Sequence, residues 1–294
     1  MSDGSIAAIV VTFNPSEALT TLITSLSLQV DTVIIVDNGS QHFELPFIRE
    51  NIKIATLENN QGIAEAQNKG ILMASKLNHE YVIFFDQDSV IPQGMIEDLS
   101  KNFKRIEKDG VKLAGVGPVF CDFRFNYFYP QIFLQENGSR LQLTPEGKDK
   151  PFEVSFMISS GSLISMKALS VIGKMESKYF IDYVDIEWCL RAGYLGYKFY
   201  SIPTSIMEHA IGDDNISFLN FKLPVHSPWR RYYRMRNMYY LFKLPYVPMR
   251  MKVREFVTNT AHQLLLTLTV PGKRIAYLKY WIKSQVDGIK IYLK

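Results

Sequence analysis

The organisation of this chain is clearest in residues 81–89, which read Tyr-Val-Ile-Phe-Phe-Asp-Gln-Asp-Ser. The five apolar residues at the start, rich in β-branched and aromatic side chains, are typical of a strand buried on both faces in a parallel sheet. Asp86 and Asp88 follow at the carboxyl end of this strand, where open α/β sheets bind their ligands. Read alone, the two acids are either ligands for a hard divalent cation or a capped turn before the helix that begins at Pro92.

Buried-strand patterns alternate with helical patterns through most of the chain. This alternation in short units predicts an α/β fold with a mostly parallel, Rossmann-like central sheet and flanking helices. Besides the strand at 81–89, the predicted strands cover residues 6–13, 32–37, 52–57, 113–120, 152–158, 161–165 and 197–202, and the first helices cover 16–28 and 62–77. Residues 122–150 are aromatic and then polar, and we expect a flexible excursion there.

Polar side chains end three of the predicted strands. Asn14, Asp37 and Asp86 each follow a buried run, as expected of a nucleotide-binding edge. The next helix begins near Asn60 and Gly62, and its small residues allow close packing either on the sheet or on a diphosphate. Neither a Walker loop nor a dinucleotide fingerprint is present in this segment.

Two further candidates lie downstream. The run from 182 to 191 predicts a helix capped by Asp182 with Asp185 at its third position. Asp185 is then either an ordinary solvated acid or a functional one. His209 alone would be read as a surface residue, and it gains interest only because it follows the acidic segments in the same sheet domain. Cys121 and Cys189 are too few and too distant for a disulfide framework, which fits a reducing compartment.

Charge is distributed unevenly along the 294 residues. Residues 215–294 carry 15 lysines and arginines against 2 acids, whereas residues 1–214 carry 18 against 27. Such asymmetry indicates a basic end that meets an anionic surface. Apolar spacing predicts helices over 252–268 and 274–294. The second has an apolar face with lysines to one side, which suits either an anionic membrane or packing on its own domain. The apolar face comprises Ile275, Leu278, Ile282, Val286 and Ile289, and the lysines are Lys279, Lys283, Lys290 and Lys294.

No run of about 18 apolar residues is present to span a membrane. The start of the chain has no basic segment followed by an apolar one, so we expect no secretory signal. The sequence therefore predicts a cytoplasmic protein that is held to a surface. Nucleic acid is a poor candidate partner, because the acidic front would repel phosphate.

Taken together, the motifs resemble those of family 2 glycosyltransferases with the GT-A fold, and within them the bacterial rhamnosyltransferases. The resemblance covers roughly residues 5–240, with six short motifs in order. The motifs are residues 12–15 (Thr-Phe-Asn-Pro), 36–40 (Val-Asp-Asn-Gly-Ser), 60–70, 85–89 (Phe-Asp-Gln-Asp-Ser), 185–191 and His209. One departure is Val184 before Asp185, where many relatives have Glu before Asp.

The resemblance implies a role for each matching residue. It makes Asp185 the catalytic base, and it places Mg²⁺ or Mn²⁺ on Asp88 with His209. Contacts to the nucleotide-sugar are assigned to Thr12, Phe13, Asn14, Asp37, Asn60, Gly62, Asn68, Asp86, Arg236 and Asn237.

The same resemblance implies an inverting, metal-dependent enzyme. Its donor would be dTDP-β-L-rhamnose, and its acceptor a lipid-linked glycan of O-antigen or capsule synthesis at the cytoplasmic face of the inner membrane. We expect a glycosyltransferase domain over residues 1–240 and an amphipathic basic helical tail over 241–294, which contacts an anionic membrane or another copy in a homo-oligomer. The alternative is a non-catalytic nucleotide-sugar-binding or scaffold protein, against which the intact set Asp86, Asp88 and Asp185 argues. A sugar nucleotidyltransferase would normally carry a glycine-rich basic loop after the first strand. This chain instead has Phe-Asn-Pro-Ser there (residues 13–16), which argues against that class.

Overall fold

The structure is a computed structural model that describes residues 4–294 except 46, 48, 126, 209–213 and 219–220. The chain forms two compact units. The N-terminal unit comprises Met1–Leu134, Leu141–Phe180 and Val184–His209, and the C-terminal unit comprises Gln135–Arg140, Ile181–Tyr183 and Ala210–Lys294.

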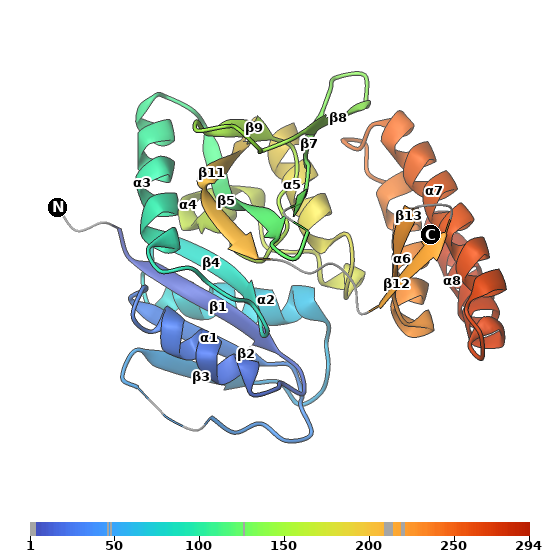
Figure 1. The fold of residues 1–294 in the computed structure, drawn as a ribbon, viewed down its shortest axis with the longest axis horizontal. Coiled ribbons are helices and arrows are strands. Elements are labelled where there is room, and N and C mark those ends of the chain that lie inside the picture. Colours follow the sequence, from blue (N-terminus) through green and yellow to red (C-terminus); the bar gives the residue numbers. More distant parts are fainter. Residues whose placement is uncertain (1–3, 46, 48, 126, 209–213, 219–220) are drawn as a thin grey trace. The chain divides into compact units, whose positions relative to one another are not determined.

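The N-terminal unit is built on one mixed sheet with the strand order β3-β2-β1-β4-β10-β5-β11-β9, and β6 pairs with β5 (Figure 1). β3, β2, β1 and β4 are parallel to one another, and β10 is antiparallel to both β4 and β5. The expected α/β fold with a mostly parallel sheet is confirmed. The strands are β1 Ile6–Thr12, β2 Thr32–Asp37, β3 Ile52–Thr56, β4 Tyr81–Asp86, β5 Leu113–Asp122, β6 Tyr127–Phe128, β9 Phe152–Val154, β10 Leu163–Ser165 and β11 Lys198–Glu208.

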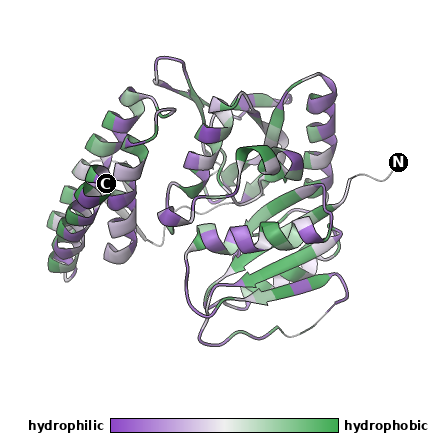
Figure 2. Ribbon diagram, turned by 180° about the vertical axis from the view of Figure 1, so that it is seen from behind, coloured by the Kyte–Doolittle hydropathy of each residue, from purple (hydrophilic) through white to green (hydrophobic). Residues whose placement is uncertain are grey.

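Helices cover both faces of this sheet. α1 and α3 share a hydrophobic core with one face of β1 and β4, where Tyr81 and Phe103 meet edge to face at 5.0 Å. α2 packs on the opposite face, because its Gly70 lies against Ile9. Figure 2 shows hydrophobic colour along the central strands and mixed colour along the helices, as expected for buried strands and amphipathic helices. The helices are α1 Ala18–Leu26, α2 Ile63–Lys76, α3 Met95–Lys108, α4 Met166–Ile172, the 3₁₀ helix η1 Ser177–Tyr179 and α5 Val184–Tyr194.

Two local expectations are wrong. Residues 122–150 are not an irregular excursion, because they contain β6, β7 (Gln131–Leu134) and β8 (Arg140–Leu143). A turn joins β7 to β8, in which Gly138 has a φ of 78° and the Ser139 amide donates to the Asn137 side chain at 2.8 Å. Asp182 does not cap α5, because the helix begins at Val184 and Asp182 has a φ of 62°, whereas an N-cap residue is extended.

The C-terminal unit contains the strand pair β12 (Asp214–Phe218) and β13 (Phe221–Val225) and three helices, α6 (Pro228–Phe242), α7 (Met249–Thr269) and α8 (Arg274–Leu293). Ser227 caps α6, and Pro228 occupies its first turn, where a missing amide proton costs nothing. α8 packs on α6 with Gly288 against the Tyr239 ring. The expected basic helical extension is therefore present, while the boundary between residues 240 and 241 stays a prediction.

The contact between Gly70 and Ile9 gives a stability prediction. A Cβ atom at position 70 would lie 2.4 Å from the Ile9 Cγ2 methyl, which is fully buried in the sheet. We expect Gly70→Ala to lower the free energy of unfolding by about 1–3 kcal/mol, because the core has no room for the added methyl. Urea denaturation measures the change.

Gly193→Ala is the matched control in helix α5. A Cβ there would meet no heavy atom within 4 Å among the described residues. This variant should be neutral or more stable by about 0.5–1 kcal/mol, because alanine is the better helix former. Equal unfolding midpoints for the two variants would contradict the packing argument.

Candidate active site

The parallel register places three strand ends side by side. Thr12 lies opposite Asp37 on β2, and Val11 lies opposite Asp86 on β4. The loops that follow β1, β2 and β4 therefore meet at one edge of the sheet, which we call the carboxyl edge. This is where ligands bind in open α/β sheets.

Asp37 is fully buried at the carboxyl edge and braces the loops around it. Its carboxylate accepts hydrogen bonds from the Thr12 hydroxyl at 3.2 Å, from the Ser40 amide at 3.1 Å and from the Ser40 hydroxyl. The Ser40 hydroxyl also accepts the Asn14 amide at 2.7 Å, and the Asn14 side chain accepts the Gln41 amide at 3.1 Å. The loops after β1 and β2 are thereby fixed to each other.

Asn60 organises the start of α2. Its side-chain oxygen accepts hydrogen bonds from the Asn38 amide group at 3.1 Å and from the Gly62 backbone at 3.0 Å. Gly62 has a φ of 88°, and a Cβ there would lie 2.6 Å from the Phe180 carbonyl oxygen. The Ile63 amide donates to the same oxygen at 2.7 Å. Glycine is therefore required at position 62 both by the backbone conformation and by the close approach of Phe180.

Asn68 has partners other than those expected. It is 7% exposed, and its side chain binds the backbone of Met175 twice, accepting from the amide at 2.9 Å and donating to the carbonyl at 2.8 Å. It also donates to the Ser177 hydroxyl at 3.2 Å. This geometry gives Asn68 a structural role, since it fixes the segment before η1 to α2, and its predicted contact with a nucleotide-sugar stays a prediction.

The turn that carries the paired acids is held from two sides. Gln87 accepts the Phe13 amide at 2.8 Å, which ties the end of β4 to the loop after β1. Ser160, only 3% exposed, accepts the Asp86 amide at 3.5 Å and shares a hydrogen bond with the Ser89 hydroxyl at 2.9 Å. Ser160 lies between the two strands predicted over residues 152–158 and 161–165, and sequence reasoning did not identify it as the support for this turn.

The donor set at the turn fits a hard cation. Asp86 is half-buried and Asp88 is exposed, and both present carboxylate oxygens at the carboxyl edge. Mg²⁺ and Mn²⁺ take oxygen ligands, and Mg²⁺ is often held by one or two carboxylates together with substrate phosphates. Within the described part of the chain, no cluster of three or more histidines, cysteines or acids is placed to hold a metal. His209, the other expected ligand, lies outside the described residues.

Asp185 is the second residue of α5 and is half-buried. Buried contacts fix its helix in place. Arg191 pairs with Glu187 at 2.9 Å and donates to the Ile172 and Lys174 carbonyls, both at 2.8 Å, while the Trp188 indole donates to the Gly173 carbonyl at 2.8 Å. Burial raises the pKa of the Cys189 thiol on the same helix, which keeps it neutral and excludes it as a nucleophile.

Arg236 and Asn237 belong to the C-terminal unit. Asn237 is fully buried, and its side chain donates to the carbonyls of Ile181 and Asp182 at 2.8 and 3.0 Å. Arg236 donates to the Asn237 oxygen at 2.7 Å and lies over the Tyr233 ring at 4.8 Å. These contacts give Asn237 an anchoring role within the chain, and its predicted contact with the nucleotide-sugar stays a prediction.

Exposed aromatic side chains follow β5. β5 and β4 are both antiparallel to β10, so the carboxyl end of β5 also lies at the carboxyl edge. Just beyond it, Phe123, Phe125 and Tyr127 are 56%, 61% and 51% exposed. Sequence reasoning recorded the aromatic run but gave it no role.

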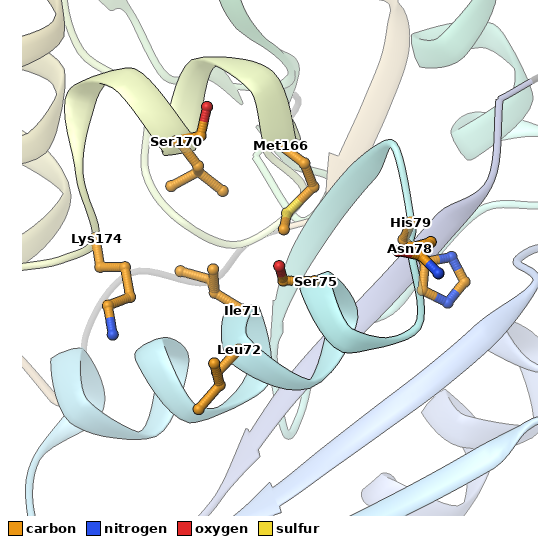
Figure 3. Close-up of a pocket in the computed structure, with 9 residues that line it drawn as sticks. Ile71, Leu72, Ser75, Asn78, His79, Met166, Ser170 and Lys174 are labelled. Carbon is orange, nitrogen blue, oxygen red and sulfur yellow. The ribbon is translucent and has the colours of Figure 1, made fainter.

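A cavity of about 450 Å³ lies elsewhere in the N-terminal unit, between α2 and α4 (Figure 3). Ile71, Leu72, Met166 and His79 are among its lining residues. Ser165, next to Met166, pairs with Tyr81 at the amino end of β4, so the cavity is at the opposite end of this strand from Asp86. It is therefore separate from the candidate site.

Comparison with known proteins identifies related sequences. The family model for glycosyl transferase family 2 matches residues 7–173. The chain is 38% identical to dTDP-rhamnosyl transferase RfbF of Shigella flexneri, over 98% of this chain and 96% of that protein. It is 24% identical to the amylovoran biosynthesis glycosyltransferase AmsB of Erwinia amylovora, over 100% of this chain and 96% of that protein.

Solved structures share the fold at lower identity. S. aureus TarS residues 1–349 in complex with UDP-GlcNAc gives a TM-score of 0.58 at 16% identity, covering 98% of this chain and 81% of that one. GalNAc-T7 with UDP, GalNAc and Mn²⁺ gives 0.56 at 14% identity, covering 91% of this chain and 58% of that one. These similarities support the fold alone.

The support that Ser160 gives to the acidic turn can be tested. We expect Ser160→Ala to weaken binding of a nucleoside diphosphate with Mn²⁺ about fivefold, because one net hydrogen bond is worth about 1 kcal/mol. Isothermal titration calorimetry measures the affinity, and Ser159→Ala is the control at the half-buried neighbouring position. Equal affinities in the two variants would show that Ser160 does not order the turn for ligand.

Proposed function

This chain belongs to glycosyl transferase family 2, and from that premise we propose that it transfers L-rhamnose from dTDP-β-L-rhamnose to a lipid-linked glycan. Family membership makes it a glycosyltransferase with the GT-A fold. The choice of donor rests on one observation, the 38% identity over 98% of the chain with a dTDP-rhamnosyl transferase.

The carboxyl edge supplies the donor site in this proposal. The loops braced by Asp37 would hold the nucleoside, with the ring of Phe13, 43% exposed, available to contact the base. Asn60 and Gly62 would act by fixing the start of α2 beside these loops. Such preorganised loops bind a nucleotide without first having to be ordered.

Asp88 would hold Mg²⁺ or Mn²⁺ at the diphosphate, and Asp86 on the same turn would contact the nucleotide-sugar. A bound divalent cation neutralises the negative charge that develops on a leaving phosphate group. Within the chain, Gln87 accepts a hydrogen bond from the Phe13 amide and Ser160 accepts one from the Asp86 amide, and these bonds keep the turn that carries the two acids in place. His209 remains a proposed ligand on sequence grounds.

Asp185 would act as the general base. It would take the proton from an acceptor hydroxyl while that oxygen attacks the anomeric carbon of the donor. The bond from the anomeric carbon to the diphosphate breaks on the opposite face, and the nucleoside diphosphate leaves. A single displacement inverts the configuration, so a β-L-rhamnosyl donor gives an α-L-rhamnoside. The exposed rings of Phe123, Phe125 and Tyr127 offer faces on which acceptor sugar rings can pack.

The C-terminal helices would hold the enzyme on an anionic membrane. No helix in the described part of the chain has the length and apolarity to cross a bilayer. However, the apolar stripe of α8 is not buried against the rest of the protein. Ile275, Ile282 and Ile289 are 83%, 56% and 49% exposed. Exposed Lys279 and Lys283 lie beside this stripe, as in helices that lie in an anionic headgroup layer.

Peripheral binding would bring the enzyme to a lipid-linked acceptor at the cytoplasmic face of the inner membrane, for O-antigen or capsule synthesis. The tail proposed over residues 241–294 contains α7 and α8, whose exposed apolar residues support this role. On α7 these are Met249, Val253, Val257, Leu264 and Leu268. Contact between two copies through the same surface is the competing use of this tail.

The assignment of Asp185 gives the central functional prediction. We expect Asp185→Asn to lower kcat by about 10²–10⁴-fold, because the amide cannot accept the proton, while donor affinity changes little. Release of deoxythymidine diphosphate from dTDP-β-L-rhamnose in the presence of Mg²⁺ and a lipid-linked acceptor measures the rate. Glu97→Gln, at an exposed acid on α3, is the control. Full turnover by Asp185→Asn would exclude this residue as the base.

The proposed membrane surface gives a second prediction. Reversing two charges with Lys279→Glu and Lys283→Glu should reduce binding to phosphatidylserine vesicles at least tenfold, because each lysine near such a surface contributes about 1 kcal/mol. Vesicle co-sedimentation of the full chain measures binding. Lys76→Glu with Lys108→Glu, two exposed sites on α2 and α3, is the matched double reversal. Equal losses in both double variants would indicate a net-charge effect and not a surface on α8.

A further inference from the structure

Residues 180–183, directly before α5, have an unusual backbone. Phe180, Asp182 and Tyr183 have φ values of 67°, 62° and 66°, in the left-handed region that non-glycine residues rarely adopt. Each such residue costs on the order of 1–3 kcal/mol, and this kind of strain persists only where the surrounding contacts impose it. The contacts made by residues 181–183 must therefore be strong enough to hold this strained backbone in place.

The Asp182 carboxylate is held by two arginines of α6. Its side chain is 6% exposed and lies 3.3 Å from Arg234 Nη1 and 3.5 Å from Arg230 Nε. Arg234 is itself fixed, because it donates to the Asn259 side chain on α7 at 2.8 Å. A buried carboxylate with these partners is costly to displace.

Asn237 holds the backbone of the same turn. Its amide nitrogen donates to the Ile181 carbonyl at 2.8 Å and to the Asp182 carbonyl at 3.0 Å. Asn237 is fully buried, so water cannot replace these bonds. Side chain and backbone of Asp182 are thus both tied to α6.

Tyr183 is anchored on α7. Its hydroxyl donates to Glu255 at 3.0 Å and accepts the Asn259 amide at 2.9 Å, and Arg234 lies over its ring at 5.4 Å. Burial raises the pKa of the Tyr183 hydroxyl, which stays protonated as a donor. For Glu255, burial works against ionisation, but hydrogen bonds from Arg254 and Tyr183 outweigh it and lower the pKa of this carboxyl. Residues 181–183 are therefore all held by hydrogen bonds or ion pairs to α6 and α7.

The chain runs from this turn straight into the proposed base, since only Val184 separates Tyr183 from Asp185. We propose that Asp182, through its arginine and asparagine anchors, is a positioning residue that sets the placement of Asp185 for proton transfer. The C-terminal helices then contribute to catalysis through the turn that they hold. This inference rests on the proposed function, in which Asp185 is the base.

A purely structural role for Asp182 makes different predictions. Loss of fold stability would lower the amount of active enzyme, and its effect would add to that of any other variant. Loss of placement would lower kcat at unchanged donor KM, because a misplacement of about 1 Å can cost on the order of a hundredfold in rate. Loss of placement would also cause no further decrease in kcat once Asp185 cannot accept a proton, because the effects of two residues that act on the same step are not additive.

The test compares Asp182→Asn, Asp185→Asn and the double variant of the full chain. With dTDP-β-L-rhamnose, Mg²⁺ and a lipid-linked acceptor, we expect Asp182→Asn to lower kcat about 10–100-fold with donor KM within twofold. The double variant should be no slower than Asp185→Asn alone. Glu176→Gln, an equally isosteric change at an acid paired with Lys178 at 2.9 Å, should leave kcat unchanged.

The outcomes separate the two proposals. An unaltered kcat in Asp182→Asn, or losses that multiply in the double variant, would overturn the positioning role and leave the glycosyltransferase proposal standing. An active Asp185→Asn enzyme, or no turnover by the unsubstituted protein, would overturn the proposed function itself. If Asp182→Asn does not fold, the kcat of Arg230→Gln tests the positioning role instead, because this variant removes only the half-exposed partner of Asp182. A wild-type kcat in that variant would then reject the positioning role.

Discussion

The parallel register of β1, β2 and β4 is the constraint on which the candidate site depends. It aligns Thr12 with Asp37 and Val11 with Asp86, so three loops that are far apart in the sequence leave the sheet at the same edge. A shift of one residue in the pairing would move every side chain of a strand to the opposite face of the sheet and would displace these strand ends relative to one another. The buried strands keep the register fixed, and the loops provide the chemistry.

Short polar side chains connect these loops. Asp37, Ser40, Asn60 and Ser160 all bind neighbouring backbone or side-chain groups. A buried polar network of this kind is stable only when its members are satisfied. The edge is therefore ordered before any ligand arrives, which lowers the entropy cost of binding a nucleotide.

The C-terminal unit combines an anchor with an exposed surface. Arginines and asparagines of α6 and α7 hold residues 181–183, and α8 leaves its apolar stripe exposed. Within α8 itself, Tyr277 and Gly288 are buried, whereas Ile275 and Ile282 are exposed. Helix geometry allows this division, since residues three or four apart share a face.

Local patterns were sufficient for the parallel strands β1 to β4, for the helices α1, α2, α7 and α8 and for the position of the acidic turn, but not for β6, β7, β8, β12, β13 or α6. Buried runs such as residues 32–37 and 81–86 are short, rich in β-branched and aromatic side chains and followed by polar residues, which is typical of buried strands. The uneven charge, and with it the basic helical end, is equally visible without a structure. The motif order also indicated the glycosyltransferase family, which the comparisons then showed.

Partners in space could be known only from the folded chain. Asn68 bonds residues 107 positions away, and Asn237 bonds residues 55 and 56 positions away, so nothing in their own segments distinguishes a ligand contact from a structural one. Asp182 looked like a helix cap because the motif is local, whereas its conformation is set by arginines about fifty residues later. Long-range hydrogen bonds and ion pairs are decided by tertiary packing, and the sequence pattern carries no record of them.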